Sequence, residues 1–267
     1  MKLPKYLGNV LIGTTAVVFA GGSYLLPDHD KNGPVLTAAV EFVAPKAQPV
    51  SDLVAMTTSA VQTLSSSVKQ LSHPQALEDA FRSYFAYKSA HPADVKKPYL
   101  YFVDYGLPST TPRGYVFDME TLKVVDGPFT VAHGRGSGGN DAVPTRFSNR
   151  NGSNSSSLGL FLAQETYAFS GHTGGRLYRS IGLRLTGLSG AFNNAARKRG
   201  VVVHGAPYVT SGKAGRSEGC PAIEPARAQR LLPKIGNGGM VFLFSPRDRS
   251  WLTRDPWANA DDDDSNG

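Results

Sequence analysis

The sequence predicts a mainly β protein with a few helices, in which a β-sandwich-like domain follows a helix and a flexible N-terminal tether. Two observations carry this prediction. After residue 98, many short runs of alternating apolar residues are separated by turn residues, and only two helical patterns interrupt them. Hydrophobic residues make up 40% of the 267 positions and charged residues 18%, which excludes a wholly disordered chain and allows one or two domains.

Residues 1–26 have the pattern of an export signal. Lys2 and Lys5 precede a largely apolar stretch over residues 7–19, and Ala20 offers a small residue before a cleavage point. Because apolar character continues to Leu26, an uncleaved membrane anchor is the alternative. Either reading predicts a protein of the periplasm or cell envelope, with membrane contact only through this segment if it is retained.

Residues 27–72 are predicted to be a tether rich in proline, serine and threonine, since such a segment buries too little apolar surface to repay its ordering entropy. A weak amphipathic helix across 51–71 is the alternative. Residues 73–97 hold an amphipathic helix over 74–90, expected to pack on the domain that follows. Its apolar stripe has helical spacing and consists of Leu77, Ala80, Phe81, Tyr84, Phe85 and Lys88.

Residues 98–250 form the predicted β domain. Strands are expected over 99–105, 114–118, 123–132, 158–169, 180–188, 201–204 and 240–244. Ser189 is predicted to cap a helix that ends at Gly200, and Pro225 opens another that ends before Gly236. Residues 251–267 are predicted to be an acidic C-terminal tail.

Cys220 is the single cysteine of the chain, so no intramolecular disulfide and no Cys-rich zinc site can form. In an exported protein, one thiol is a buried inert residue, an intermolecular bridge or a nucleophile. The net charge of +7 suggests an anionic partner, for which nucleic acid and an anionic cell-wall polymer both qualify.

The strongest chemical pattern pairs Cys220 with His204. His204 ends an apolar strand, and the turn residues at 212–215 allow the chain to fold back and bring the two side chains together. A neighbouring imidazole can stabilise the thiolate and shuttle its proton. The amides of Gly219 and Cys220 can point at a developing oxyanion. The structural alternative is a buried small hydrophobe and a hydrogen-bonded core histidine.

Together, His204-Gly205 and the run RSEGCP at 216–221 resemble the signature of the L,D-transpeptidases, the YkuD-type enzymes, and more specifically the branch of the murein L,D-transpeptidase catalytic domain. Further matching pieces follow in the expected order over about residues 99–245: YVFD at 115–118, VAHGRGSG at 131–138, FSN at 147–149, SSLG at 156–159 and GLRL at 182–185. The resemblance implies a catalytic domain over 98–250 that cross-links peptidoglycan stem peptides through a thioester on Cys220. His204 would be the general base and Gly219 an oxyanion-hole amide, with no metal or organic cofactor and no nucleic acid partner.

Two departures from the family pattern affect substrate binding. Glu218 stands where many members have histidine, and Ala222 follows Pro221 where an arginine is common. Glu218 is expected to orient His204, to bind a substrate amine or to face solvent. Arg216 is the candidate for the substrate carboxylate, with a plain surface arginine as the alternative. The predicted binding set is completed by Ser217, Gly205 and His133, and a structural loop histidine is the alternative for His133.

Four other functions are alternatives to this hypothesis. A cysteine acyltransferase that attaches proteins or D-amino acids to peptidoglycan would use the same residues. A non-catalytic cell-wall-binding protein would have an unreactive thiol. A sortase-like enzyme needs an arginine shortly after the cysteine, where this chain has Pro221, Ala222 and Ile223. An NlpC-type peptidase needs a histidine after the cysteine, and every histidine of the chain precedes Cys220.

Overall fold

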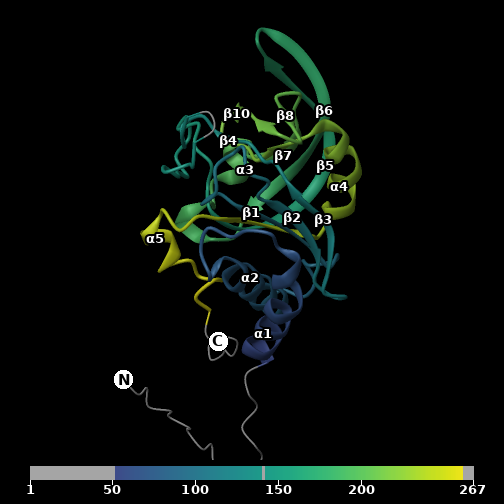
Figure 1. Ribbon diagram of the computed structural model, residues 1–267, viewed down its shortest axis with the longest axis vertical. Coiled ribbons are helices and arrows are strands. Elements are labelled where there is room, and N and C mark those ends of the chain that lie inside the picture. The colour runs from purple at the N-terminus through teal and green to yellow at the C-terminus, as the bar shows by residue number, and fades with distance from the viewer. Residues whose placement is uncertain (1–51, 140–141, 261–267) are drawn as a thin grey trace, which may run out of the picture. The chain divides into compact units, whose positions relative to one another are not determined.

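The computed structural model describes residues 52–139 and 142–260 (Figure 1). The predicted signal or anchor, most of the tether and residues 261–267 lie outside the described residues. An eight-stranded sheet forms the main layer, in the order β11-β7-β6-β5-β12-β1-β2-β3. Its strands are β1 (Tyr99–Asp104), β2 (Gly114–Asp118), β3 (Lys123–Phe129), β5 (Gly159–Thr173), β6 (Arg176–Gly187), β7 (Val202–Gly205), β11 (Ala222–Ile223) and β12 (Met240–Phe244). The predicted mainly β class with few helices is confirmed.

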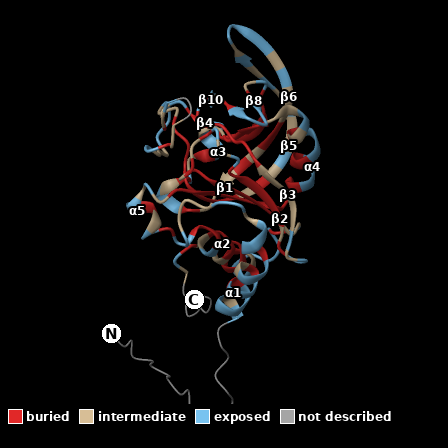
Figure 2. Ribbon diagram, in the orientation of Figure 1, coloured by how far each residue is buried: buried red, intermediate tan, exposed pale blue. Residues whose placement is uncertain are grey.

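The central strands are apolar because both faces of the sheet are covered. Every residue of β12 is buried, and β12 pairs in parallel with β1 and antiparallel with β5. Helix α2 (Ala76–Ala90) packs against β12 and β1, and helix α4 (Pro225–Ile235) packs against β6 and β7. Figure 2 shows the resulting band of buried residues along the middle of the sheet.

Strands β5 and β6 form one long hairpin that projects beyond the sheet (Figure 1). Their pairing continues to Thr173 opposite Arg176, and Gly174 and Gly175 close the turn with positive φ values of 55° and 76°. The sequence predicts shorter strands than these. The half of the hairpin nearest the turn is exposed, so its residues do not need the alternation of apolar and polar side chains that marks a half-buried strand. Two two-stranded ribbons lie apart from the main sheet: β4 (His133–Gly134) with β10 (Arg216–Ser217), and β8 (Val209–Thr210) with β9 (Lys213–Ala214).

The helical N-terminal part of the described chain is longer than predicted. Helix α2 agrees with the expectation over 74–90, but residues assigned to the tether form helix α1 (Asp52–Leu64) and a 3₁₀ turn, η1 (Ser65–Ser67). Ala60 and Leu64 are buried in the core, which repays the ordering entropy of α1. Over residues 52–67, the alternative prediction of a helix across 51–71 therefore describes the chain better than the prediction of a tether does.

The helix predicted from Ser189 to Gly200 is broken into a 3₁₀ turn, η2 (Gly190–Phe192), and a short helix, α3 (Ala196–Arg199). The Ser189 hydroxyl accepts a hydrogen bond from the Leu160 amide (2.8 Å) and does not cap a helix. Gly200 ends α3 in the left-handed conformation with φ of 69°, as predicted. Helix α4 has Pro225 in its first turn, also as predicted.

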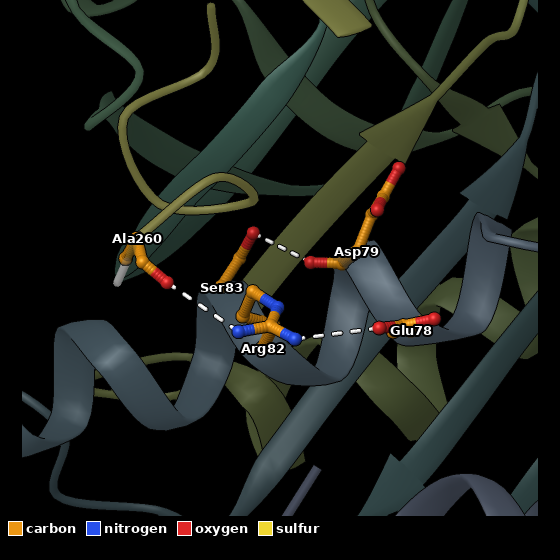
Figure 3. A network of polar contacts seen from close by, with 5 residues as sticks. All are labelled: Glu78, Asp79, Arg82, Ser83 and Ala260. Atoms are coloured by element: carbon orange, nitrogen blue, oxygen red, sulfur yellow. Dashed lines mark hydrogen bonds and ion pairs between the residues drawn. The ribbon is translucent and has the colours of Figure 1, made fainter. Parts of the chain in front are cut away.

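The acidic-tail prediction is wrong for residues 251–260, which pack on the domain. Helix α5 (Arg249–Leu252) buries Trp251 completely, and the Trp257 indole donates to the Leu188 carbonyl (2.8 Å). Arg82 of α2 donates to the carbonyl of Ala260 (3.4 Å), as Figure 3 shows. Burial of these aromatic side chains stabilises the packing of residues 251–260 on the domain.

In the described part of the chain, no helix combines the length and apolar character needed to cross a membrane.

Candidate functional site

His204 lies near the end of β7, where the strand is paired on both sides. It stands opposite Gly182 of β6 and opposite Ala222 of β11. The three valines at 201–203 are buried, and only 3% of the His204 surface is exposed. The next residue is Gly205. A side chain at this position would place its Cβ 2.3 Å from the Ser180 hydroxyl, which is too close. Gly205 therefore serves close packing in this structure.

The surroundings of His204 keep its ring neutral and fix its tautomer. The ring stacks on Phe169, with centroids 4.2 Å apart and an angle of 19°. Nδ1 lies 3.2 Å from the Gly205 carbonyl, which only accepts, so Nδ1 carries the proton and Nε2 is the basic atom. Burial lowers the pKa of His204 to about 4. At neutral pH the imidazole is uncharged and can accept a proton.

Cys220 is brought next to β7 by the parallel pairing of β11. The His204 amide donates to the carbonyl of Pro221 (3.3 Å), the residue directly after the cysteine. The Cys220 side chain is partly exposed, and its Sγ lies 3.8 Å from the Gly200 carbonyl. Burial raises the pKa of the Cys220 thiol, the Val202 amide and Arg199 lower it, and Glu218 raises it. At neutral pH, Cys220 is therefore a thiol and His204 a neutral imidazole, and the β7–β11 pairing places their strand and turn side by side.

A tight turn over residues 217–220 presents the cysteine. The Ser217 hydroxyl donates to the Cys220 carbonyl (2.6 Å) and accepts the Gly219 amide (3.2 Å). Gly219 has φ of 126°, which side-chain-bearing residues rarely adopt, and a Cβ there would lie 3.0 Å from the Ser155 carbonyl. In this conformation the Gly219 amide, predicted as an oxyanion donor, is engaged inside the turn. Within the described residues, the Cys220 amide has no hydrogen-bond acceptor.

The turn rests on a rear wall formed by Gly134 and Ser156. The buried Ser156 hydroxyl donates to the Gly219 carbonyl (3.0 Å) and accepts the Gly134 amide (3.0 Å). A Cβ on Gly134 would lie 2.7 Å from the Cα of Gly219. Gly134 lies opposite Ser217 in the β4–β10 ribbon, so the ribbon and this contact hold the turn together.

The predicted binding residues fall in different places. Glu218 pairs with Arg135 (2.8 Å), and both side chains are more than half exposed. His133 is fully buried, and its Nδ1 accepts from the Arg113 guanidinium (3.0 Å). Burial and the charge of Arg113 lower the pKa of His133 to about 4. Of the predicted binding residues, Arg216 lines a groove, and Arg135, which the sequence did not single out, lines it too.

That groove has a volume of about 530 Å³ and is lined by Arg135, His172, Thr173, Pro207, Tyr208, Thr210, Lys213, Ala214, Gly215 and Arg216. The charged residues that line it in the described part of the chain are cationic, and one of them, Arg135, pairs with Glu218. Tyr208 links the groove to the histidine, since the rings of Tyr208 and His204 are 6.5 Å apart. Among the described residues, no group of three or more His, Cys, Asp or Glu side chains is arranged to hold a metal ion.

Sequence reasoning missed Arg199, Ser156 and Phe169. Ser156 and Phe169 lie far from Cys220 along the chain and reach the site through loop and hairpin geometry. Ser156 lies in the quoted family segment at 156–159, whereas Phe169 and Arg199 lie in a predicted strand and a predicted helix that carry no functional signal.

A family model described as the L,D-transpeptidase catalytic domain matches residues 68–244. Similar solved structures include an L,D-transpeptidase from Mycobacterium smegmatis (17% identity, 55% of this chain and 58% of that chain, TM-score 0.33). Another is from Xylanimonas cellulosilytica DSM 15894 (15% identity, 55% of this chain and 61% of that chain, TM-score 0.32). The chain thus spans less than two thirds of the length of these proteins. No curated protein matches the chain.

Proposed function

Because the chain belongs to the L,D-transpeptidase catalytic domain family, we propose that it is a cysteine transpeptidase that cross-links the stem peptides of peptidoglycan. The observation that carries this proposal is the pairing of β7 with β11, which sets the strand of His204 beside the turn of Cys220. A basic residue next to a partly exposed thiol is the arrangement that nucleophilic catalysis requires. The proposed working place is the periplasm or cell envelope.

The first half-reaction forms a thioester. Cys220 Sγ attacks a carbonyl at an L-centre of the donor stem, while its proton passes to Nε2 of His204. The oxyanion that forms on the carbonyl accepts a hydrogen bond from the Cys220 amide, which has no other acceptor among the described residues. The carbon–nitrogen bond then breaks, and the leaving amine takes the proton from His204.

The second half-reaction resolves the thioester. An amine of a neighbouring stem attacks the thioester carbonyl and gives its proton to His204. The carbon–sulfur bond breaks as the new amide forms, and the sulfur takes the proton back. His204 suits both transfers because burial keeps its ring neutral at the start of each.

The cationic groove beside the turn suits a substrate that carries carboxylates. Arg135, Lys213 and Arg216 line it, and stem peptides are anionic at neutral pH. In this proposal, the donor or acceptor stem lies along the groove and reaches Cys220 past Tyr208.

The test incubates the purified protein with muropeptides and analyses the products by mass spectrometry. The native protein should form cross-linked dimers, and Cys220→Ala should form none. Cys220→Ser is the matched control, since it keeps the size and polarity of the side chain but supplies a much weaker nucleophile. Dimers that persist in Cys220→Ala would overturn the proposal. Product mass also separates stem cross-linking from attachment of a protein or exchange of a D-amino acid.

A further inference from the structure

Arg199, the last residue of α3, reaches the loop behind the cysteine turn. Its Nη1 donates to the carbonyl of Ser148 (2.7 Å) and to the hydroxyl of Ser157 (2.6 Å). Its Nη2 donates to the hydroxyl of Ser153 (3.1 Å) and to the carbonyl of Ser155 (2.9 Å). One guanidinium therefore holds both ends of the loop that supplies the rear wall of the turn.

All four acceptors are neutral, so the positive charge of Arg199 has no carboxylate partner in the described part of the chain. Arg197, on the same short helix, differs in this respect because it pairs with Glu165 (3.0 Å). Partial burial of a cation costs desolvation free energy. A nearby anion would offset that cost.

The candidate anion is the thiolate of Cys220. A Cβ on Gly219 would lie 3.8 Å from Arg199 Nη2, and the Cys220 Sγ lies 3.8 Å from the carbonyl of Gly200, the residue after Arg199. The effect is reciprocal: Arg199 lowers the pKa of the thiol, and Cys220 raises the pKa of the guanidinium, each against the larger effect of burial.

His204 cannot supply this charge in the resting protein, because burial keeps the imidazole neutral near pH 7. The side chain of Glu218 acts in the opposite direction, since its negative charge raises the pKa of the thiol. Of the charged groups that influence the thiol, Arg199 is the one that stabilises its anionic form.

We propose that Arg199 is a positioning residue that stabilises the Cys220 thiolate with its charge while its hydrogen bonds hold the 148–157 loop behind the turn. The inference rests on the proposed function, in that it treats Cys220 as the nucleophile. The charge effect itself is measured on the thiol, without any substrate.

The experiment is the pH dependence of alkylation by iodoacetamide, followed by intact mass. Cys220 is the single cysteine, so no other thiol contributes. Arg199→Gln removes the charge and should raise the thiol pKa by about 0.5 to 1 unit, equal to about three- to tenfold less thiolate at neutral pH. Arg199→Lys keeps the charge and should retain the wild-type pKa. Arg197→Gln removes a charge from the same helix and should change nothing.

A folded Arg199→Gln with the wild-type thiol pKa would overturn the proposal. If that variant does not fold, Ser153→Asp replaces it, because a carboxylate at this position lies against Nη2 and neutralises the guanidinium in place. Its uncharged control is Ser153→Asn. An unchanged thiol pKa in Ser153→Asp would likewise overturn the proposal. Failure of the proposed function would appear in a different experiment, as cross-linking by Cys220→Ala. It would not change the alkylation results.

Discussion

The hydroxyl of Ser156 donates to the carbonyl oxygen of Gly219 at 3.0 Å, and this hydrogen bond fixes the peptide group that joins Gly219 to Cys220. In a trans peptide the carbonyl and the amide of one group point in opposite directions. With the Gly219 carbonyl held against the rear wall, the Cys220 amide is turned away from that wall. The direction of the proposed oxyanion donor therefore depends on a serine far away in the sequence.

Ser156→Ala should reduce the rate of thioester formation by about tenfold or more, because the peptide group is no longer held in one orientation. The Gly134 amide also loses its acceptor, which costs about 1 to 3 kcal/mol of stability. Acylation by a donor stem peptide, followed by intact mass, measures the rate. Ser83→Ala is the control, since it removes a buried hydroxyl that bonds only within α2. An unchanged acylation rate in Ser156→Ala would exclude this role.

Gly134→Ala should impair both folding and acylation. The new Cβ would lie 2.3 Å from the Asn154 carbonyl and 2.7 Å from the Cα of Gly219, and both are backbone atoms that cannot move cheaply. We expect a loss of about 1 to 3 kcal/mol in the free energy of unfolding. Urea denaturation measures the loss, with Gly212→Ala as the control because no atom lies within 4 Å of a Cβ there. Equal stability of the two variants would contradict the close approach.

The acylation rate should stay high as the pH falls from 7 to 5 and decline near pH 4. The neutral imidazole is the proposed base, so activity is present above the pKa of His204, which burial lowers to about 4. Phe169→Ala removes the ring stacked on His204, admits water and should shift this decline toward pH 6.5, the ordinary value. Leu177→Ala, at the exposed part of the hairpin, is the control. A decline near pH 6.5 in the native protein would contradict the buried, neutral histidine.

Asp79→Asn should stabilise the protein above pH 7. Burial, aided by Glu78 and Asp255, raises the pKa of Asp79 to about 7, whereas an unfolded aspartate has a pKa of about 3.9. The contribution of Asp79 to stability is therefore fully present below about pH 4 and lost as the pH rises through about 7. We expect Asn to add on the order of 1 kcal/mol at pH 8. Thermal unfolding at pH 5 and pH 8 measures this difference, and the exposed Asp52→Asn serves as the control. The same gain at both pH values would contradict the shifted carboxyl.

The sequence predicts those parts of the fold and site that depend on neighbours along the chain. The apolar run before His204, the glycine of the Cys220 turn and Pro225 in the first turn of α4 are local signals. Arg199 and Ser156 are not predictable in this way, because their importance comes from contacts between a helix end, an irregular loop and a turn. The sequence places residues 52–64 in the tether, because the burial of helix α1 depends on its contact with α2, which lies outside the local pattern.

Trapping of the acyl-enzyme tests the central claim most directly. The native protein is incubated with a donor stem peptide in the absence of an acceptor, and its intact mass and peptide map are recorded. We predict a mass gain equal to the donor minus its leaving amine, located on Cys220, absent from Cys220→Ala and much slower to form in His204→Ala. Release of the leaving amine with no covalent adduct on Cys220, or an adduct on another residue, would contradict the proposed mechanism.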